Sequence, residues 1–132
     1  MLRPVRGPLI ALILGAVGVC GCGGGLSDTE QVQATVDAFG RATAAKDYQR
    51  LCDDLLAPKL VSEVESAGLP CELALKQGLG DVSAPRLTIG TIRVKGDSAT
   101  ADVQSSAQGE EPSRDTLQLV RVDDSWRIAS LK

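Results

Sequence analysis

Apolar positions recur at helical spacing in the part of the chain that follows residue 26. Ser27 and Glu30 match a capping box, and Val32, Val36 and Phe39 then fall on one helix face. This pattern predicts a first helix that runs to about residue 46. A second helix is expected from residue 47 to the proline stop at residues 57–58. Its inward positions follow i, i+3, i+4 and i+7 spacing and are Tyr48, Leu51, Cys52 and Leu55.

Two shorter helices are predicted next. The third helix is expected to end at Gly68, and Pro70 is expected to begin the fourth, which ends at the glycines at 78 and 80. Their inward residues are Leu60, Val64 and Ala67 for the third helix, and Cys71, Ala74 and Leu75 for the fourth.

From residue 86 the pattern changes from helical to alternating. RLTIGTIRV and SATADVQ flank Lys95-Gly96-Asp97, and DTLQLVRV and WRIASL flank Asp123-Asp124-Ser125. These segments predict four strands joined as two tight hairpins. The apolar parity of the first strand changes at Gly90, which predicts a β-bulge that bends the sheet. The third strand has apolar residues on both faces, so both faces are expected to be partly covered.

The first 21 residues match an export signal. Arg3 and Arg6 precede LIALILGAVGVCG, an apolar run of about 13 residues that is shorter than the ~20 needed to span a membrane. The run ends in Val19-Cys20-Gly21-Cys22, without an Ala-x-Ala cleavage motif. This ending resembles the lipobox of bacterial lipoproteins, in which the Cys after Gly is acylated and becomes the N-terminus. In that register Cys22 carries fatty-acyl chains such as palmitate, and residues 22–27 form a Gly-rich tether.

Two other interpretations apply to Cys20 and Cys22. In the first, the two cysteines are small apolar residues at the end of an uncleaved anchor. In the second, they belong to a metal or redox site. The metal or redox site is disfavoured because no His and no second close Cys pair accompanies them. A lipid anchor predicts that the protein lies on the outer face of the cytoplasmic membrane.

The other two cysteines, Cys52 and Cys71, are expected to form a disulfide, because an exported protein folds in an oxidising compartment. Closing a loop of about 20 residues would stabilise the domain by roughly 3 kcal/mol. The bond would join the second predicted helix to the fourth. The alternative is a reactive thiol at Cys71, which follows Pro70 at a helix start, and it is disfavoured because no His can act as its base.

Length and charge narrow the function classes. The chain has 132 residues, with 14 Lys and Arg against 17 Asp and Glu, so its length fits one small domain at residues 28–132. Without Arg3 and Arg6 the balance is 12 minus 17, or −5, which argues against a nucleic-acid surface. With no His and very few aromatic residues, we expect neither a metal nor another cofactor, and no base-stacking surface. The acidic pairs at 110–111 and 123–124 are either contact points or solvated loop tips.

The order of these elements resembles the nuclear transport factor 2-like superfamily, and in particular its actinobacterial lipoprotein members. The resemblance covers residues 28–132 and rests most on the A..KDY..LC..L helix pair within DTEQVQATVDAFGRATAAKDYQRLCDDL and on the final DSWRI strand. It implies an α+β fold in which N-terminal helices pack on a curved four-stranded antiparallel sheet, forming a cone around an apolar pocket. Relatives use this cone as an enzyme cavity, a ligand site or a protein-contact surface, so the fold does not decide the function.

The sequence offers no clear catalytic group for such a pocket. Asp37 and Asp102 are expected to face away from the apolar rows, and Asp53 and Asp54 to lie on a solvated helix edge. We therefore expect a non-catalytic, membrane-tethered domain that binds an apolar small molecule or an envelope protein. The alternative is an isomerase- or cyclase-like enzyme that uses the cone cavity. The residues expected to line the pocket or fill the core are Val36, Phe39, Tyr48, Leu55, Leu117, Leu119, Trp126 and Ile128.

Overall fold

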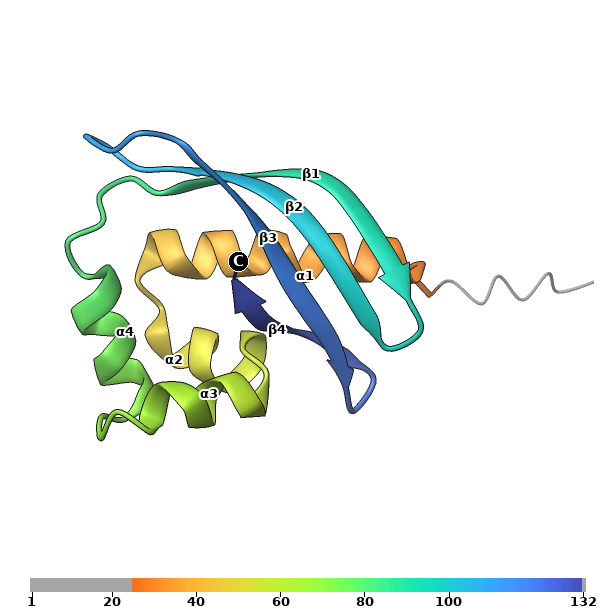
Figure 1. Cartoon of the computed structure of the whole chain (residues 1–132), viewed down its shortest axis with the longest axis horizontal. Helices are drawn as coiled ribbons and strands as arrows, with labels where there is room; N and C mark the ends of the chain where they lie inside the picture. The colour runs from red at the N-terminus through yellow and green to blue at the C-terminus, as the bar shows by residue number, and fades with distance from the viewer. Residues whose placement is uncertain (1–24, 132) are drawn as a thin grey trace, which may run out of the picture.

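The computed structural model describes residues 25–131 (Figure 1). The predicted signal peptide, Cys20, Cys22 and the C-terminal Lys132 lie outside the described residues. Within residues 25–131, no helix is long and apolar enough to cross a membrane. The lipid anchor at Cys22 therefore stays a prediction.

Helix α1 spans Asp28–Ala45 and begins with the predicted capping box. The Ser27 Oγ accepts a hydrogen bond from the Glu30 backbone N–H at 3.2 Å, and the Glu30 carboxylate accepts one from the Ser27 N–H at 2.8 Å. Helix capping of this kind satisfies N–H groups that have no partner within the helix. Val32 and Val36 are fully buried, so the predicted helix and its inward face are confirmed.

The second predicted helix is only partly regular. Helix α2 covers Tyr48–Arg50, and the chain continues as a wider π-helical segment, η1, over Leu51–Leu55. The Leu56 N–H donates to the Leu51 carbonyl at 2.9 Å, one residue farther back than in an α-helix. After this wide turn Leu56 is extended, and both Leu55 and Leu56 are buried. The prediction of one continuous α-helix to residue 57 is therefore wrong in its second half.

Helix α3 spans Pro58–Glu65 and helix α4 spans Cys71–Leu79. The predicted end of the third helix at Gly68 is wrong, because the helix stops at Glu65 and Ala67 lies exposed in the turn that follows. The Gly68 N–H donates to the Glu65 carbonyl at 2.9 Å, and Gly68 has a φ of 92°. This left-handed conformation turns the chain away from the helix axis.

The second half of the domain is a four-stranded antiparallel sheet with the order β1-β2-β3-β4. The strands are β1 Arg86–Lys95, β2 Ser98–Ser106, β3 Ser113–Val122 and β4 Ser125–Leu131. Asp123 and Asp124 both have positive φ, as a type I′ hairpin turn requires. The two predicted hairpins are confirmed.

The bulge predicted at Gly90 is present as a register shift between Ile89 and Ile92 of β1. The extra residue keeps the apolar residues on both sides of the shift against the core. Glycine suits this position because a Cβ would lie 3.3 Å from the Asp102 carbonyl oxygen. The bulge therefore reconciles the two apolar parities of this strand.

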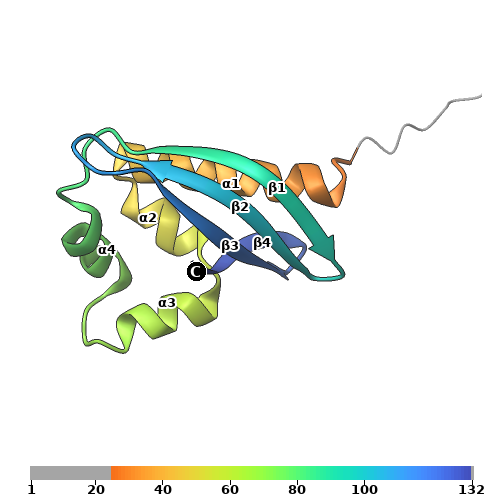
Figure 2. The same cartoon turned by 45° about the horizontal axis from the view of Figure 1, so that its top comes forward.

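The helices lie together on the inner side of the curved sheet (Figures 1 and 2). The segment after η1 also joins the sheet edge, because Leu56 forms a parallel bridge with Ile128 and the Ala57 N–H donates to the Ile128 carbonyl at 2.8 Å. Apolar residues of α1, η1 and all four strands meet in one core between these layers. The predicted α+β fold with helices packed on a curved sheet is confirmed.

Candidate functional site

An apolar cavity of about 450 Å³ lies between the helices and one end of the sheet. Its walls come from the second half of α1, from η1, α3 and α4, and from the ends of the strands around the β2–β3 loop. Its apolar lining includes Phe39, Leu56, Leu60, Leu75, Leu87 and Val103. A concave, mainly apolar surface of this volume is typical of a small-molecule site.

A disulfide positions one wall of the cavity. Cys52 of η1 and Cys71 of α4 are bonded, with their Cα atoms 6.1 Å apart, so the predicted bond is present. Helix α4 contributes Ala74, Leu75 and Leu79 to the cavity lining. Because a bonded sulfur is not a thiolate, the alternative of a reactive thiol at Cys71 does not apply to this structure.

One side of the cavity is polar. It is lined by Ser105 on β2 and by Ser113 and Asp115 on β3. Along each strand, these positions alternate with positions whose side chains lie on the outer face of the sheet. The Ser113 hydroxyl donates to Asp115 Oδ2 at 3.0 Å, the Ser105 hydroxyl does so at 3.4 Å, and the two hydroxyl oxygens lie 2.8 Å apart. Asp115 therefore presents a hydrogen-bonded carboxylate to an otherwise apolar space.

Negative charge dominates the border of the cavity. Glu110 and Glu111 in the β2–β3 loop are exposed, Asp115 is half-buried, and Arg86 lies at the start of β1. Three carboxylates and one guanidinium give a formal charge of −3 + 1 = −2 at this border. The ion pairs found within residues 25–131 involve none of these four side chains.

The residues predicted for the pocket or core divide between three places. Phe39 lines the cavity. Tyr48 borders a separate, more open depression beside the disulfide, and its hydroxyl has no hydrogen-bond partner among the described residues. The other six residues are buried in the packed core: Val36, Leu55, Leu117, Leu119, Trp126 and Ile128. The sequence pattern thus located the core, whereas most of the cavity lining comes from other positions on α3, α4 and the strand ends.

The carboxylates considered from the sequence lie away from the cavity. Asp37, Asp53 and Asp54 are exposed. Asp102 lies on the outer face of the sheet, where it accepts hydrogen bonds from Arg93 at 3.3 Å and Thr116 at 3.1 Å. In the described part of the chain, no group of three or more His, Cys, Asp or Glu side chains is placed to hold a metal ion.

Sequence reasoning overlooked Asp115. Its signal is present in the third strand, because Asp115 stands two residues before Leu117 and four before Leu119. Alternate residues of a strand share a face, so Asp115 shares the face of these two buried leucines. Strand parity alone would therefore have assigned an inward-facing carboxylate.

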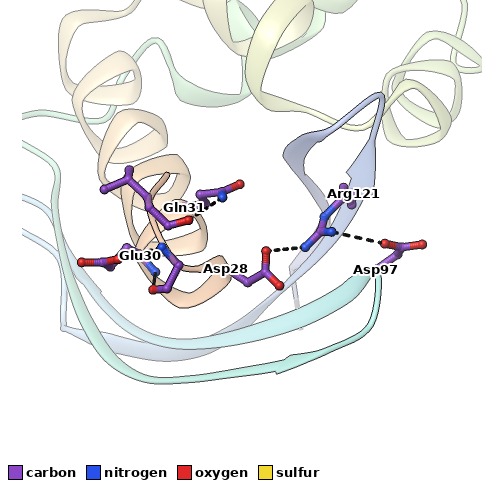
Figure 3. Close-up of polar contacts among 7 residues, drawn as sticks. Asp28, Glu30, Gln31, Asp97 and Arg121 are labelled. Atoms are coloured by element: carbon purple, nitrogen blue, oxygen red, sulfur yellow. Dashed lines mark hydrogen bonds and ion pairs between the residues drawn. The ribbon is translucent and has the colours of Figure 1, made fainter. Parts of the chain in front are cut away.

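A second polar cluster lies at the other end of the domain (Figure 3). Arg121 on β3 pairs with Asp28 at 2.5 Å and with Asp97 of the β1–β2 turn at 3.7 Å, and its guanidinium lies 4.7 Å from the ring centroid of Trp126. These contacts hold the first turn of α1 against the hairpin tips. Phe39 is about 17 Å farther along the helix axis at ~1.5 Å per residue, so the cavity and this junction lie at opposite ends of α1.

Comparison with known proteins agrees with this architecture. A sequence profile of a family described as putative lumazine-binding matches residues 74–131. An NTF2-like protein of unknown function from Silicibacter pomeroyi superposes with a TM-score of 0.57 at 19% identity, covering 77% of this chain and 90% of that chain. A de novo designed NTF2-fold protein has a TM-score of 0.54 at 15% identity, with 80% and 87% covered. No curated protein of similar sequence was found.

These similarities show that the described domain has the nuclear transport factor 2-like fold. The fold expected from the helix pair and the final strand is thus confirmed. The assignment to a lipoprotein depends on residues outside the described range.

Proposed function

We propose that this protein is an extracytoplasmic lipoprotein whose domain binds a small, largely apolar molecule in the cavity without transforming it. The observation that carries the proposal is the cavity of about 450 Å³ with its mainly apolar lining. A domain that served only as a packed scaffold would gain stability by closing such a space, because unfilled apolar volume is destabilising. The similarity to a family also supports binding, since the profile described as putative lumazine-binding covers the last six residues of α4 and the four strands.

Binding is tested by filling the cavity. Ala74 lines it, whereas Ala34 is exposed on α1, so Ala74→Phe and Ala34→Phe add the same group inside and outside the site. We expect the neutral fluorescent probe N-phenyl-1-naphthylamine, and lumazine as a second probe, to bind the wild type and Ala34→Phe but to bind Ala74→Phe at least about tenfold more weakly. Equal binding to both variants would contradict the proposed site.

The natural ligand is sought by mass spectrometry of the protein extracted from its own membranes, recorded first natively and then after denaturation. A discrete excess in the native mass identifies a bound small molecule. A native complex with another envelope protein and no small molecule would favour the protein-interaction alternative.

The membrane tether in the proposal rests on the lipobox-like Val19-Cys20-Gly21-Cys22. The domain is compatible with it, because α1 begins at Asp28, at the opposite end of the helix from the cavity-lining Phe39. We expect Cys22→Ala to leave the membrane fraction and the matched variant Cys20→Ala to stay in it. Retention of Cys22→Ala in the membrane would refute the lipid anchor.

An isomerase- or cyclase-like enzyme is the second candidate, and Asp115 is the observation that favours it. A carboxylate on an apolar cavity can serve as a general base. A non-catalytic role is the better supported of the two, because within residues 25–131 the Asp115 carboxylate accepts hydrogen bonds only from the hydroxyls of Ser105 and Ser113. The two candidates are distinguished by NMR spectra of the molecule identified by mass spectrometry, recorded before and after incubation with the protein. Unchanged spectra support a non-catalytic role, and a product whose formation requires Asp115 supports catalysis.

A further inference from the structure

Most polar groups of the cavity are gathered on one side of it; Thr43 on α1 is an exception, and its hydroxyl donates to the Phe39 carbonyl at 2.8 Å. Ser105, Ser113 and Asp115 belong to β2 and β3, and Glu110 and Glu111 lie in the loop that joins these strands. The facing helices contribute apolar side chains, among them Leu60, Val64, Leu75 and Leu79. A molecule in the cavity would therefore contact apolar walls along its body and polar groups at one end.

Carboxylate oxygens outnumber charged donors at this polar end, where three carboxylates and the single guanidinium of Arg86 line the cavity. Both serine hydroxyls are within hydrogen-bond distance of Asp115 Oδ2, and within residues 25–131 no hydrogen bond is made to Oδ1. An ionised carboxylate can accept about four hydrogen bonds. Because the serine protons are engaged within the cluster, the groups left for a ligand are the carboxylate oxygens and, at the border, the guanidinium of Arg86.

The net charge at the border of the cavity also disfavours an anionic ligand. The border carries three carboxylates and one guanidinium, and no ion pair within residues 25–131 neutralises any of the carboxylates. Asp115 is half-buried beside the apolar lining, where a charge interacts more strongly than in water. A carboxylate or phosphate on the ligand would bring like charges together at this end of the cavity.

We infer that the ligand has an apolar body and a cationic, amine-bearing end, and that Asp115 is the residue that selects this end. The inference rests on the proposed function and adds the chemical class of the ligand. The ammonium group donates to the Asp115 carboxylate, Glu110 and Glu111 add attraction at the border, and the apolar body lies against α3 and α4.

Three probes with one apolar body test this inference: adamantylamine, adamantanol and adamantanecarboxylate, titrated calorimetrically into the full-length protein. We expect the amine to bind at least about tenfold more tightly than the alcohol, and the carboxylate to bind most weakly, because charge-assisted hydrogen bonds are the stronger kind. Asp115→Asn should remove most of the advantage of the amine and leave the alcohol unchanged.

The matched control is Asp123→Asn, which neutralises a carboxylate at the β3–β4 turn; Asn is well tolerated at its φ of 48°. This variant should bind all three probes like the wild type. If Asp115→Asn fails to fold, as judged by its thermal melt, the double variant Glu110→Gln/Glu111→Gln should still lower the affinity for the amine by about threefold or more.

The outcomes separate this inference from the proposed function. Equal affinities for the three probes, with loss of binding in Ala74→Phe, would support the cavity and overturn the cationic ligand. The cationic ligand would also be overturned if adamantanecarboxylate bound most tightly, or if a folded Asp115→Asn protein kept the full preference for adamantylamine over adamantanol. Binding of none of the three probes, together with no binding of N-phenyl-1-naphthylamine, would contradict the proposed function and the inference with it.

Discussion

Removing the Cys52–Cys71 disulfide is expected to destabilise the domain strongly. The bond closes a loop between residues 19 positions apart and connects η1 to α4. Both cysteines are buried, at 9% and 4% exposure, so the perturbation is best made as Cys52→Ala/Cys71→Ala, which leaves no polar group in the core.

The magnitude follows from the length of the loop. In the chain-entropy model, a crosslink across 19 residues restricts the unfolded chain by about 3 kcal/mol at 25 °C. For a domain of about 100 residues, ~1 kcal/mol corresponds to ~4–8 °C in Tm, so a loss of about 3 kcal/mol should lower the Tm of the double variant by roughly 12–24 °C. The small voids left by the two sulfurs add to this loss.

The assay is urea unfolding of the oxidised wild type, the reduced wild type and the double variant, followed by far-ultraviolet circular dichroism. The reduced wild type and the double variant should both lose the free energy of unfolding that the crosslink contributes, and the double variant should lose somewhat more because of its voids. Affinity for N-phenyl-1-naphthylamine should also fall in both, because α4 forms part of the cavity wall. A loss of less than about 1 kcal/mol, or free thiols at both cysteines of the exported protein, would refute the reasoning.

Three further predictions concern the rest of the domain. Ile128→Ala should lower the free energy of unfolding by about 2–5 kcal/mol, because Ile128 is fully buried; a loss below about 1 kcal/mol in urea titration would contradict the packing described. The hydrogen bond from the Ser27 backbone N–H to the Glu30 carboxylate, and after it the hydrogen bond with the Ser27 side chain, lower the pKa of Glu30 below the ordinary 4.5. The stability that ionised Glu30 contributes is therefore present above that value and is lost as pH falls below it. Glu30→Gln should therefore flatten the stability profile as pH falls below 4.5, and an unchanged profile would argue against the capping box. Arg121→Ala should lower the free energy of unfolding by about 1–2 kcal/mol, because Arg121 loses its ion pairs and its contact with the Trp126 ring. The control Arg93→Ala, whose side chain is 66% exposed, should lower it by less than about 1 kcal/mol. Equal losses in urea titration would count against a specific junction at the start of α1.

Much of the fold was predictable because it depends on short-range patterns. The capping box at Ser27 and Glu30 and the hairpin turns are local, and their chemistry appears directly in neighbouring residues. The parity change at Gly90 likewise predicted the bulge. The Cys52–Cys71 bond was predicted from two remaining cysteines and from the oxidising compartment that the predicted leader would imply.

The second half of the second helix was not predictable in the same way. The π-helical segment η1 buries Leu51, Cys52 and Leu55, the same residues that α-helical spacing predicts to face inward, so the apolar pattern does not distinguish the two kinds of turn. What favours the wide turn is contact with distant residues: Leu56 pairs with Ile128, and the Arg127 guanidinium donates to the Asp53 carbonyl at 2.7 Å. These contacts exist only after β4 has joined the sheet.

The candidate site likewise combines features that the sequence predicts with features that depend on contacts between distant residues. Hydrophobic periodicity identifies which side chains leave water, and it selected core residues such as Leu117, Leu119 and Ile128. It does not show whether the space between buried faces is filled or left open, because that depends on how closely α3 and α4 approach the strand ends. Phe39 is the one predicted pocket residue that lines the cavity.

The sequence by itself determined the helices' positions within a few residues, the two hairpins, the bulge and the pair of cysteines that bond. Each of these depends on neighbouring residues or on a countable set of side chains. Only the tertiary structure decided the cavity, its polar side at Asp115 and the placement of the α1 junction at the opposite end. These features arise where elements distant in the chain meet, and the distances between such elements are set by packing of the complete domain.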